Sequence, residues 1–600
     1  MKLRNMAGLA ALLLACPAAA EAVAPAPHRP NIVLILADDV GFSDFGAYGS
    51  EIATPNIDAI AARGVLFSNF HASPICAPSR AMLMTGVDSH LAGVGNLPEA
   101  VPLEHRGQPG YLGYLADDVV TVASRLQAAG YRTTMAGKWH LGHEEPGMLP
   151  PAHGFDRSFA LDASGADNWE KRPYLPIYDD APWFEDGEPA GLPSDFYSST
   201  FIVDKTIEYL DEGGERDTPF FSYLAFQAVH IPVQAPRAYI EKYDGVYEDG
   251  PEALRAARFR GVVERGLVSA GAKLGPMPKG LDAWDGLPEA EKRLRAKSMA
   301  VNAAMLEAMD ANIGRFMQHL KETGEYDNTV FFILSDNGPE PNDPLATPGF
   351  AQWLRWVGYS RDIETLGEKG TFAFIGPEFA SADASPGAFF KFHAGEGGIR
   401  VPLVVSGAHI PARGRVGAFS FITDIAPTIL DLASVAREPE FEGKKVQGIT
   451  GRSLLPLLQD GSQTHYAASE PVGVEAAGNV ALFRGSYKLV RNMPPYGDGK
   501  FHLHDIARDP GETADLSEAE PALLAAMQAD YAAYKARVGV LDVPEGYRQM
   551  KQITINRLYD RRGSLIIGGL GFLLVFGGLV WLGVFSVRRL RARGRAQPSP

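Results

Sequence analysis

Residues 76–86 read CAPSRAMLMTG and place a reactive side chain beside a predicted helix. Pro78 suits the first turn of a helix, where its missing N–H would be unpaired anyway, and Arg80 to Met84 are good helix formers. Cys76 is therefore predicted at the mouth of this helix, where free N–H groups and the helix dipole favour an anion. Taken alone, the segment fits a buried structural cysteine equally well, because free cysteine is among the most buried residue types.

Carboxylate and amide side chains follow two predicted strands. Asp38 and Asp39 come directly after the apolar run 31–37, and Asp336 and Asn337 come after a second apolar run. Crowded carboxylates repel each other unless a cation lies between them, and an all-oxygen set suits Ca²⁺ or Mg²⁺. By themselves, such pairs at strand ends are weak evidence for a metal site.

Strands and helices alternate along most of the chain, which predicts an α/β fold with a mostly parallel sheet between helices. Open α/β sheets bind ligands at the carboxyl ends of their strands, where the polar residues fall here. Residues 145–200 show little periodicity and are predicted to be long surface loops. From His465 onward, short strands and a helix over 519–535 predict a smaller antiparallel domain. The main expected strands are 31–37, 131–136, 220–229, 330–334 and 401–406, and the main expected helices are 54–63, 122–129 and 289–322.

Composition excludes some classes of function. The net charge of -16 argues against nucleic-acid binding, which needs a basic surface. The only cysteines are Cys16 and Cys76, so the mature chain has no disulfide framework. Residues 1–22 have the basic start, apolar core and small-residue end of a secretory signal peptide. Cys16 also fits a bacterial lipoprotein processing site, and the alternative is that it is removed with the leader.

Residues 564–587 contain no charged side chain and are long enough to span a bilayer. They predict one transmembrane helix, with the basic tail inside and the catalytic part exported. The expected division is 1–22 signal peptide, 23–464 catalytic domain, 465–545 smaller C-terminal domain, 546–563 juxtamembrane linker, 564–587 transmembrane helix and 588–600 cytoplasmic tail.

Several blocks resemble those of the sulfatase family. The signature around Cys76 matches position by position, and further blocks stand at 29–49, 54–70, 136–142, 334–338 and 395–402. The resemblance covers roughly residues 29 to 540 and is greatest to the bacterial arylsulfatases. It implies the alkaline-phosphatase-like α/β fold with a smaller C-terminal sheet and helix.

The resemblance also implies a site and a reaction. A maturation enzyme would oxidise Cys76 to formylglycine, whose hydrate is the nucleophile that forms a sulfated-enzyme intermediate. Ca²⁺, with Mg²⁺ as the alternative, would be held by Asp38, Asp39, Asp336, Asn337 and the modified Cys76. The implied catalytic residues are Cys76, Arg80, Lys138, His140, His230 and Lys391. His393, Glu396 and Arg400 fall near the last block and are expected to be structural.

The leading hypothesis is an arylsulfatase that acts on a small sulfate ester. It is expected in the bacterial periplasm, held in the inner membrane by its C-terminal helix. A formylglycine-dependent phosphonate monoester or phosphodiester hydrolase is the alternative. A non-catalytic binding protein is a third reading, against which the complete set of reactive residues argues.

Overall fold

The computed structural model describes residues 29–143, 145–213, 218–562, 580–586 and 588–589. The predicted signal peptide 1–22, with Cys16, lies outside the described residues.

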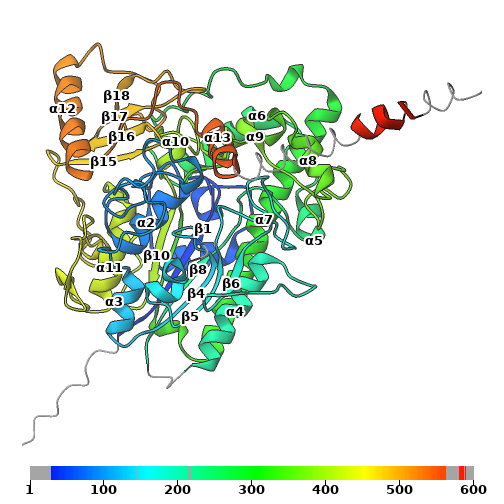
Figure 1. The fold of residues 1–600 in the computed structure, drawn as a ribbon. Coiled ribbons are helices and arrows are strands. Elements are labelled where there is room, and N and C mark those ends of the chain that lie inside the picture. The colour runs from blue at the N-terminus through cyan, green and yellow to red at the C-terminus, as the bar shows by residue number, and fades with distance from the viewer. Residues whose placement is uncertain (1–28, 144, 214–217, 563–579, 587, 590–600) are drawn as a thin grey trace, which may run out of the picture.

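A ten-stranded mixed sheet forms the centre of the molecule (Figure 1). Its five middle strands, β9, β1, β8, β4 and β5, are parallel, and β10 runs antiparallel to β9. This arrangement confirms the predicted mostly parallel sheet. In spatial order the strands are β11 (Gly414–Val416), β2 (Val65–Phe67), β10 (Leu403–Gly407), β9 (Thr329–Ser335), β1 (Asn31–Ala37), β8 (Phe220–Ala225), β4 (Arg132–Lys138), β5 (Arg157–Leu161), β6 (Trp183–Glu185) and β7 (Glu188–Pro189).

Helices cover both faces of this sheet. The helices are α1 (Pro55–Ala62), α2 (Cys76–Thr85), α3 (Val122–Ala128), α4 (Ser198–Glu212), α5 (Arg237–Ile240), α6 (Gly250–Glu264), α7 (Glu289–Glu322), α8 (Phe350–Trp356), α9 (Gly376–Asp383), α10 (Glu396–Ile399), α11 (Ile425–Leu432), α12 (Pro521–Val538) and α13 (Gln549–Asp560). Alternate residues of β1 enter two separate cores, one built with α2, α3 and α11 and the other with α1, α4 and α7. Because side chains of a strand alternate between faces, burial on both sides explains the continuous apolar run of β1.

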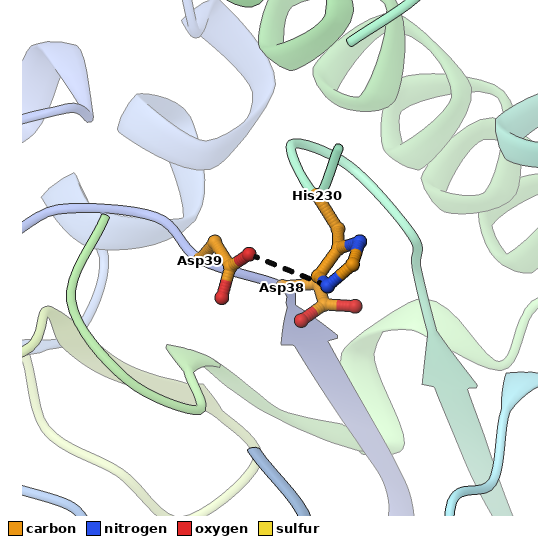
Figure 2. A group of neighbouring side chains, drawn as sticks. All are labelled: Asp38, Asp39 and His230. Atoms are coloured by element: carbon orange, nitrogen blue, oxygen red, sulfur yellow. Dashed lines mark ion pairs between the residues drawn. The ribbon is translucent and has the colours of Figure 1, made fainter. Parts of the chain in front are cut away.

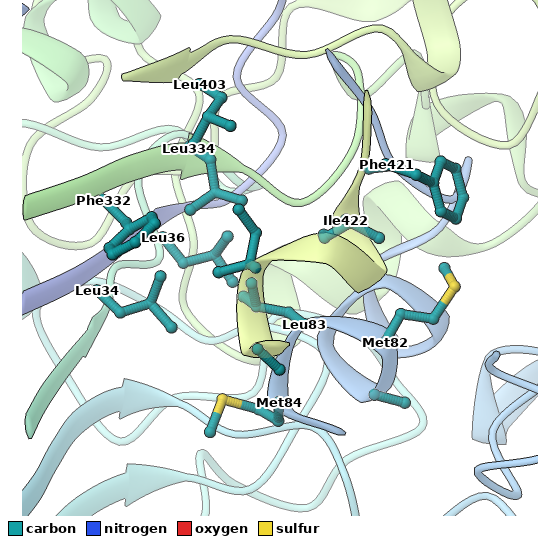
Figure 3. Packing of buried hydrophobic residues seen from close by; sticks show 14 of the residues in the cluster. Leu34, Leu36, Met82, Leu83, Met84, Phe332, Leu334, Leu403, Phe421 and Ile422 are labelled. Atoms are coloured by element: carbon teal, nitrogen blue, oxygen red, sulfur yellow. The ribbon is translucent and has the colours of Figure 1, made fainter. Parts of the chain in front are cut away.

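The helix that begins at Cys76 is fixed against the sheet. Met82, Leu83 and Met84 of α2 belong to one buried cluster with Leu34 of β1 and Phe332 of β9. Figure 3 shows Leu83 and Met84 on the side of these strands and Met82 beside Phe421 and Ile422. All ten residues of α2 are buried. Since buried side chains interdigitate at close to crystalline density, this contact leaves the start of α2 little freedom to move relative to the strand ends.

A second sheet of four antiparallel strands lies in the C-terminal part of the chain. Met527, Tyr531 and Tyr534 of α12 pack against its apolar face, as expected for a half-buried antiparallel sheet. Its strands are β15 (Pro471–Ala476), β16 (Asn479–Arg484), β17 (Tyr487–Arg491) and β18 (Phe501–Asp505). Two smaller pairs join β3 (Phe70–His71) to β12 (Ser420–Phe421) and β13 (Glu440–Phe441) to β14 (Lys444–Lys445).

Two segments carry structure that the sequence pattern did not indicate. The range 145–200, predicted as loops, supplies β5, β6 and β7 to one edge of the central sheet. The range 546–563, predicted as a linker, contains the helix α13. Figure 1 places α13 with the body of the molecule.

The prediction of a transmembrane helix over 564–587 is wrong for the part of the chain that the structure describes. No helix among the described residues is long and apolar enough to cross a membrane. Residues 564–579 and 587 lie outside the described residues. The fold class is therefore the α/β sheet with the smaller C-terminal sheet. The membrane partner and the inner-membrane location, which rested on that helix, are corrected with it.

Candidate active site

The four predicted oxygen donors lie together at the carboxyl ends of two adjacent strands. Strands β1 and β9 are parallel neighbours, with Ala37 opposite Ser335, so the residues that follow them meet. The backbone N–H of Asp39 donates to Oδ1 of Asp336 over 3.2 Å, and Nδ2 of Asn337 donates to Oδ1 of Asp39 over 2.6 Å.

Each of the three carboxylates faces one of the three predicted cations. Lys138, at the end of β4, places Nζ 2.7 Å from Oδ2 of Asp38. Arg80, in α2, places Nη2 2.8 Å from Oδ2 of Asp336. These side chains are fully buried, so their pairing in a low dielectric is strong, and removing one partner would leave an uncompensated charge.

Lys391 forms the third pair and has a second acidic neighbour. Its Nζ lies 2.7 Å from Oδ1 of Asp39 and 2.8 Å from Oε2 of Glu340. Burial alone would lower the pKa of Lys391, but the carboxylates of Asp39 and Glu340 raise it well above its usual value. Lys391 therefore stays cationic at neutral pH.

Cys76 is the first residue of α2, as predicted, and it faces His140. The distance from Sγ of Cys76 to Nδ1 of His140 is 3.6 Å. Burial raises the pKa of the Cys76 thiol to about 11 and lowers the pKa of His140 to about 4. At neutral pH the thiol is protonated and the imidazole is neutral, so this site does not activate a thiolate nucleophile.

His230 lies on the other side of the carboxylate group. Figure 2 shows Asp38, Asp39 and His230 converging, with Nε2 of His230 3.8 Å from Oδ2 of Asp39. Its Nδ1 lies 2.7 Å from the carbonyl oxygen of Ile231, an acceptor that assigns the proton to Nδ1 and leaves Nε2 facing the site. A Cβ at Gly165 would come within 2.6 Å of Nδ1, so only glycine leaves room for this ring.

Two residues of the site adopt a backbone conformation that is unfavourable for side chains. Asp39 has φ 65° and His140 has φ 58°. Such left-handed residues cost free energy and persist where the surrounding structure holds them, often at functional sites. The buried contacts of both side chains supply that restraint.

The donor set fits a hard divalent cation. One ligand atom from each of Asp38, Asp39 and His230 lies within 4.8 Å of the others. Oδ1 of Asp38 and Oδ1 of Asn337 are buried without a hydrogen-bond partner, which is unusual for buried polar atoms. Burial is the largest cause that raises the pKa of Asp39 to about 6 and also raises that of Asp336, and the neighbouring carboxylates add to it.

Two acidic residues of the site escaped the sequence analysis. Oε1 of Glu99 lies 3.4 Å from Nε2 of His140, and Glu340 pairs with Lys391. Each is a single carboxylate in an irregular segment, with no motif around it to signal its place. Both lie in the wall of the pocket above Cys76.

In the contacts described, the side chains of Glu396 and Arg400 do not reach this cluster, and His393 contacts only its backbone, with Nδ1 3.2 Å from the carbonyl oxygen of Lys391. Carboxylate oxygens of Glu396 lie 3.1 Å from Nε2 of His71 and 2.8 Å from Nζ of Lys488. Because Lys488 belongs to β17, this buried network ties the C-terminal sheet to the catalytic body. The contacts favour the structural role expected for these residues.

An open pocket leads from the protein surface to Cys76. Cys76, His230 and Lys391 contribute to its lining, together with many apolar side chains. The predicted nucleophile position and two predicted catalytic residues are therefore accessible from one cavity.

Comparison with known proteins agrees with this geometry. The sulfatase family model matches residues 30–435. An uncharacterized sulfatase of Schizosaccharomyces pombe is 36% identical over 533 residues, covering 86% of this chain and 96% of that protein. The arylsulfatase of Klebsiella aerogenes is 34% identical over 467 residues, covering 76% of this chain and 97% of that enzyme.

Solved structures share the fold. The structure of Ps i-CgsB in complex with k-i-k-neocarrahexaose matches with a TM-score of 0.59 at 23% identity, covering 84% of this chain and 92% of that one. At 23% sequence identity, this similarity supports a shared fold and nothing further. The family model and the two relatives together establish that this chain belongs to the sulfatase family, the hydrolases of sulfate esters.

Proposed function

We propose that this chain hydrolyses sulfate monoesters through a formylglycine made from Cys76. The observation that carries the proposal is the position of Cys76, which opens a buried helix at an accessible pocket lined also by His230 and Lys391. The high pKa of the thiol supports a modified residue, because an unmodified Cys76 would stay protonated and unreactive at neutral pH.

The modification supplies chemistry that a thiol lacks. When present, the hydrated aldehyde offers one hydroxyl as the nucleophile and a second hydroxyl that allows sulfate to be expelled afterwards. Conversion of the thiol to the aldehyde is an oxidation that removes the sulfur, so the maturation enzyme must supply an oxidant. His140 faces position 76 in its neutral form, which can accept a proton from a hydroxyl there.

We assign the leaving-group side to Lys391 and His230. Lys391 keeps its charge and can stabilise the negative charge that develops on the leaving oxygen. Burial, Lys391 and Lys138 lower the pKa of His230 well below its usual value, so the free enzyme holds this ring neutral. The negative charge of a bound sulfate ester would favour protonation of Nε2, which faces the site and can then donate to that oxygen. Arg80 and Lys138 hold Asp336 and Asp38 in place.

We propose Ca²⁺ as the cation, held by Asp38, Asp39, Asp336 and Asn337, with His230 at the edge of the group. When bound, the cation would offset the carboxylate charge and attract the sulfate group. The protein's own side chains do not neutralise the carboxylate charge around Lys391. This lysine carries one positive charge, and its two neighbours Asp39 and Glu340 carry one negative charge each.

The test compares matched 4-nitrophenyl sulfate, 4-nitrophenyl phosphate and 4-nitrophenyl phenylphosphonate, using protein produced with a formylglycine-generating enzyme. We expect the highest kcat/KM for the sulfate, read as a difference in transition-state stabilisation. A phosphonate or phosphodiester turned over faster than the sulfate would favour the alternative hydrolase, and no turnover of any ester by the modified protein would favour a binding role.

A further inference from the structure

The helix α13 forms part of the pocket above Cys76. Met550, Ile553 and Thr554 of this helix line the same cavity as Cys76 and Lys391. The helix lies beyond residue 435, where the match to the family model ends. The pocket is therefore completed by an element that the family's catalytic motifs do not contain.

Buried hydrogen bonds hold α13 in this position. Nδ2 of Asn556 donates to the carbonyl oxygens of Glu99 and Val101 over 2.8 and 2.9 Å, and Asn556 is 3% exposed. Just before the helix, the hydroxyl of Tyr547 donates to the carbonyl oxygen of Ala100 over 2.9 Å. Buried bonds of this kind are costly to break, so α13 is a fixed wall whose partner segment itself carries the pocket residue Glu99.

The wall of the pocket is apolar where α13 meets the loops opposite. Most of the lining is apolar, including Leu97, Leu175, Ile177, Ile231, Met550 and Ile553. Such a surface gains free energy by covering an apolar group and loses it when it strips water from a polar one.

The charges in the pocket also disfavour a negatively charged leaving group. Besides Lys391 and His230, the acidic and basic side chains in the described lining are the carboxylates of Glu99 and Glu340. Lys391 is already paired with Glu340 and Asp39. A leaving group with its own carboxylate or second sulfate would meet acidic side chains and an apolar wall, with no free cation in the described lining to bind it.

We propose that α13 is a specificity element that selects sulfate esters of neutral, largely apolar phenols and alcohols, with Met550 and Ile553 in contact with the leaving group. This inference rests on the proposed sulfatase activity. It assigns the leaving-group site to a helix outside the family's catalytic core and excludes polyanionic sugars as preferred substrates.

The first test measures kcat/KM for phenyl sulfate and 2-naphthyl sulfate with Ile553→Ala, Met550→Ala and Asn556→Ala. We expect the preference for the larger ester to fall about tenfold, because lost apolar contacts in a pocket cost this much or more. Leu558→Ala is the matched control, since Leu558 lies on the same helix, is 57% exposed and does not line the pocket. Thermal unfolding of each variant checks that it folds, and Met550, 42% exposed, is the substitution least able to disturb folding.

The second test changes charge. We compare 4-carboxyphenyl sulfate with its neutral methyl ester, and expect the wild-type enzyme to prefer the ester. Met550→Lys should raise the relative kcat/KM of the carboxylate substrate about fivefold, since a cation at a partly exposed site attracts it modestly, while Met550→Gln should not.

The outcomes separate the two proposals. A wild-type enzyme that hydrolyses no sulfate ester removes the proposed function. An active wild-type enzyme whose size preference is unchanged by all three α13 variants, or that prefers the carboxylated substrate, overturns the role of α13 and leaves the sulfatase activity standing.

Discussion

The floor and the wall of the pocket differ in composition and in origin. The floor consists of buried ionic side chains at strand ends and at the start of α2, all within the matched range 30–435. The wall is mostly apolar, apart from Glu99 and Glu340, and combines side chains from within that range with those of α13, which lies beyond it. In our proposals the floor carries out the reaction, and the wall, α13 included, selects the leaving group.

The largest effect is expected from the floor. Cys76→Ala removes the position of the proposed nucleophile, so kcat should fall by about 10³-fold or more. The side chain is small and buried, so the fold should survive. Steady-state assays with 4-nitrophenyl sulfate, together with circular dichroism, check this. A folded Cys76→Ala variant with normal turnover would place the chemistry elsewhere.

The second-largest loss of activity is expected from Lys391→Ala. Loss of a cation that stabilises developing charge should lower kcat by about 10²- to 10³-fold. Substrates with better leaving groups should suffer less, because they need less stabilisation of the leaving oxygen. A loss that does not depend on the pKa of the leaving phenol would contradict the assignment of Lys391 to that side. Lys369→Ala, at an exposed position, is the control.

The pH dependence of cation binding tests whether Asp39, in the floor of the pocket, is a ligand of the cation. Burial raises the folded-state pKa of Asp39 from 3.8 to about 6. Folded protein then binds more protons than unfolded protein, so the cation-free enzyme should lose stability as the pH rises from about 4 to about 6. Protons also compete with the cation, so Ca²⁺ affinity should be about tenfold weaker at pH 5 than at pH 7.5.

Calorimetric titration of chelator-treated enzyme with Ca²⁺ at both pH values measures this difference. The Tm gain on adding Ca²⁺ should likewise be larger at pH 7.5. Equal affinity at both pH values would show that Asp39 does not bind the cation.

The smallest effect is expected at the wall. Ile177→Ala should lower kcat/KM for 2-naphthyl sulfate by about three- to tenfold and change kcat little for small esters, because it removes only apolar contact with the leaving group. A loss of kcat/KM as large as that of Lys391→Ala would contradict the assignment of Ile177 to leaving-group contact alone. Steady-state kinetics with both esters decide it.

The same contrast explains what the sequence could predict. Strands β1 and β9 are buried on both faces, so their apolar runs were visible, and α7 was predicted over its full length. The polar pairs that follow the two strands meet because parallel neighbours end at the same edge. Motif blocks then located Cys76 and the cations around it.

The wall could not be predicted in this way. The strands β5, β6 and β7 are short and extend the sheet from β4 to its edge at β7, within an aromatic and acidic stretch where no apolar run marks them. Helix α13 turns Met550 and Ile553 to the pocket, but it also carries exposed apolar side chains such as Leu558 and many polar ones, so no single apolar face marked it as a helix in the sequence. Glu99 and Glu340 are single carboxylates whose importance depends on contacts made through folding. For the apolar range 564–587 the error was an excess of predicted structure. Its composition alone suggested a membrane-spanning helix, and no described helix is long and apolar enough to be one.

The measurement that tests the central claim most directly is mass spectrometry of the peptide that contains Cys76, taken from protein with measured sulfatase activity. The account predicts that the thiol sulfur is lost and replaced by an aldehyde oxygen, in a fraction of molecules that rises in proportion to kcat. Fully active enzyme with an unmodified cysteine at position 76 would contradict it.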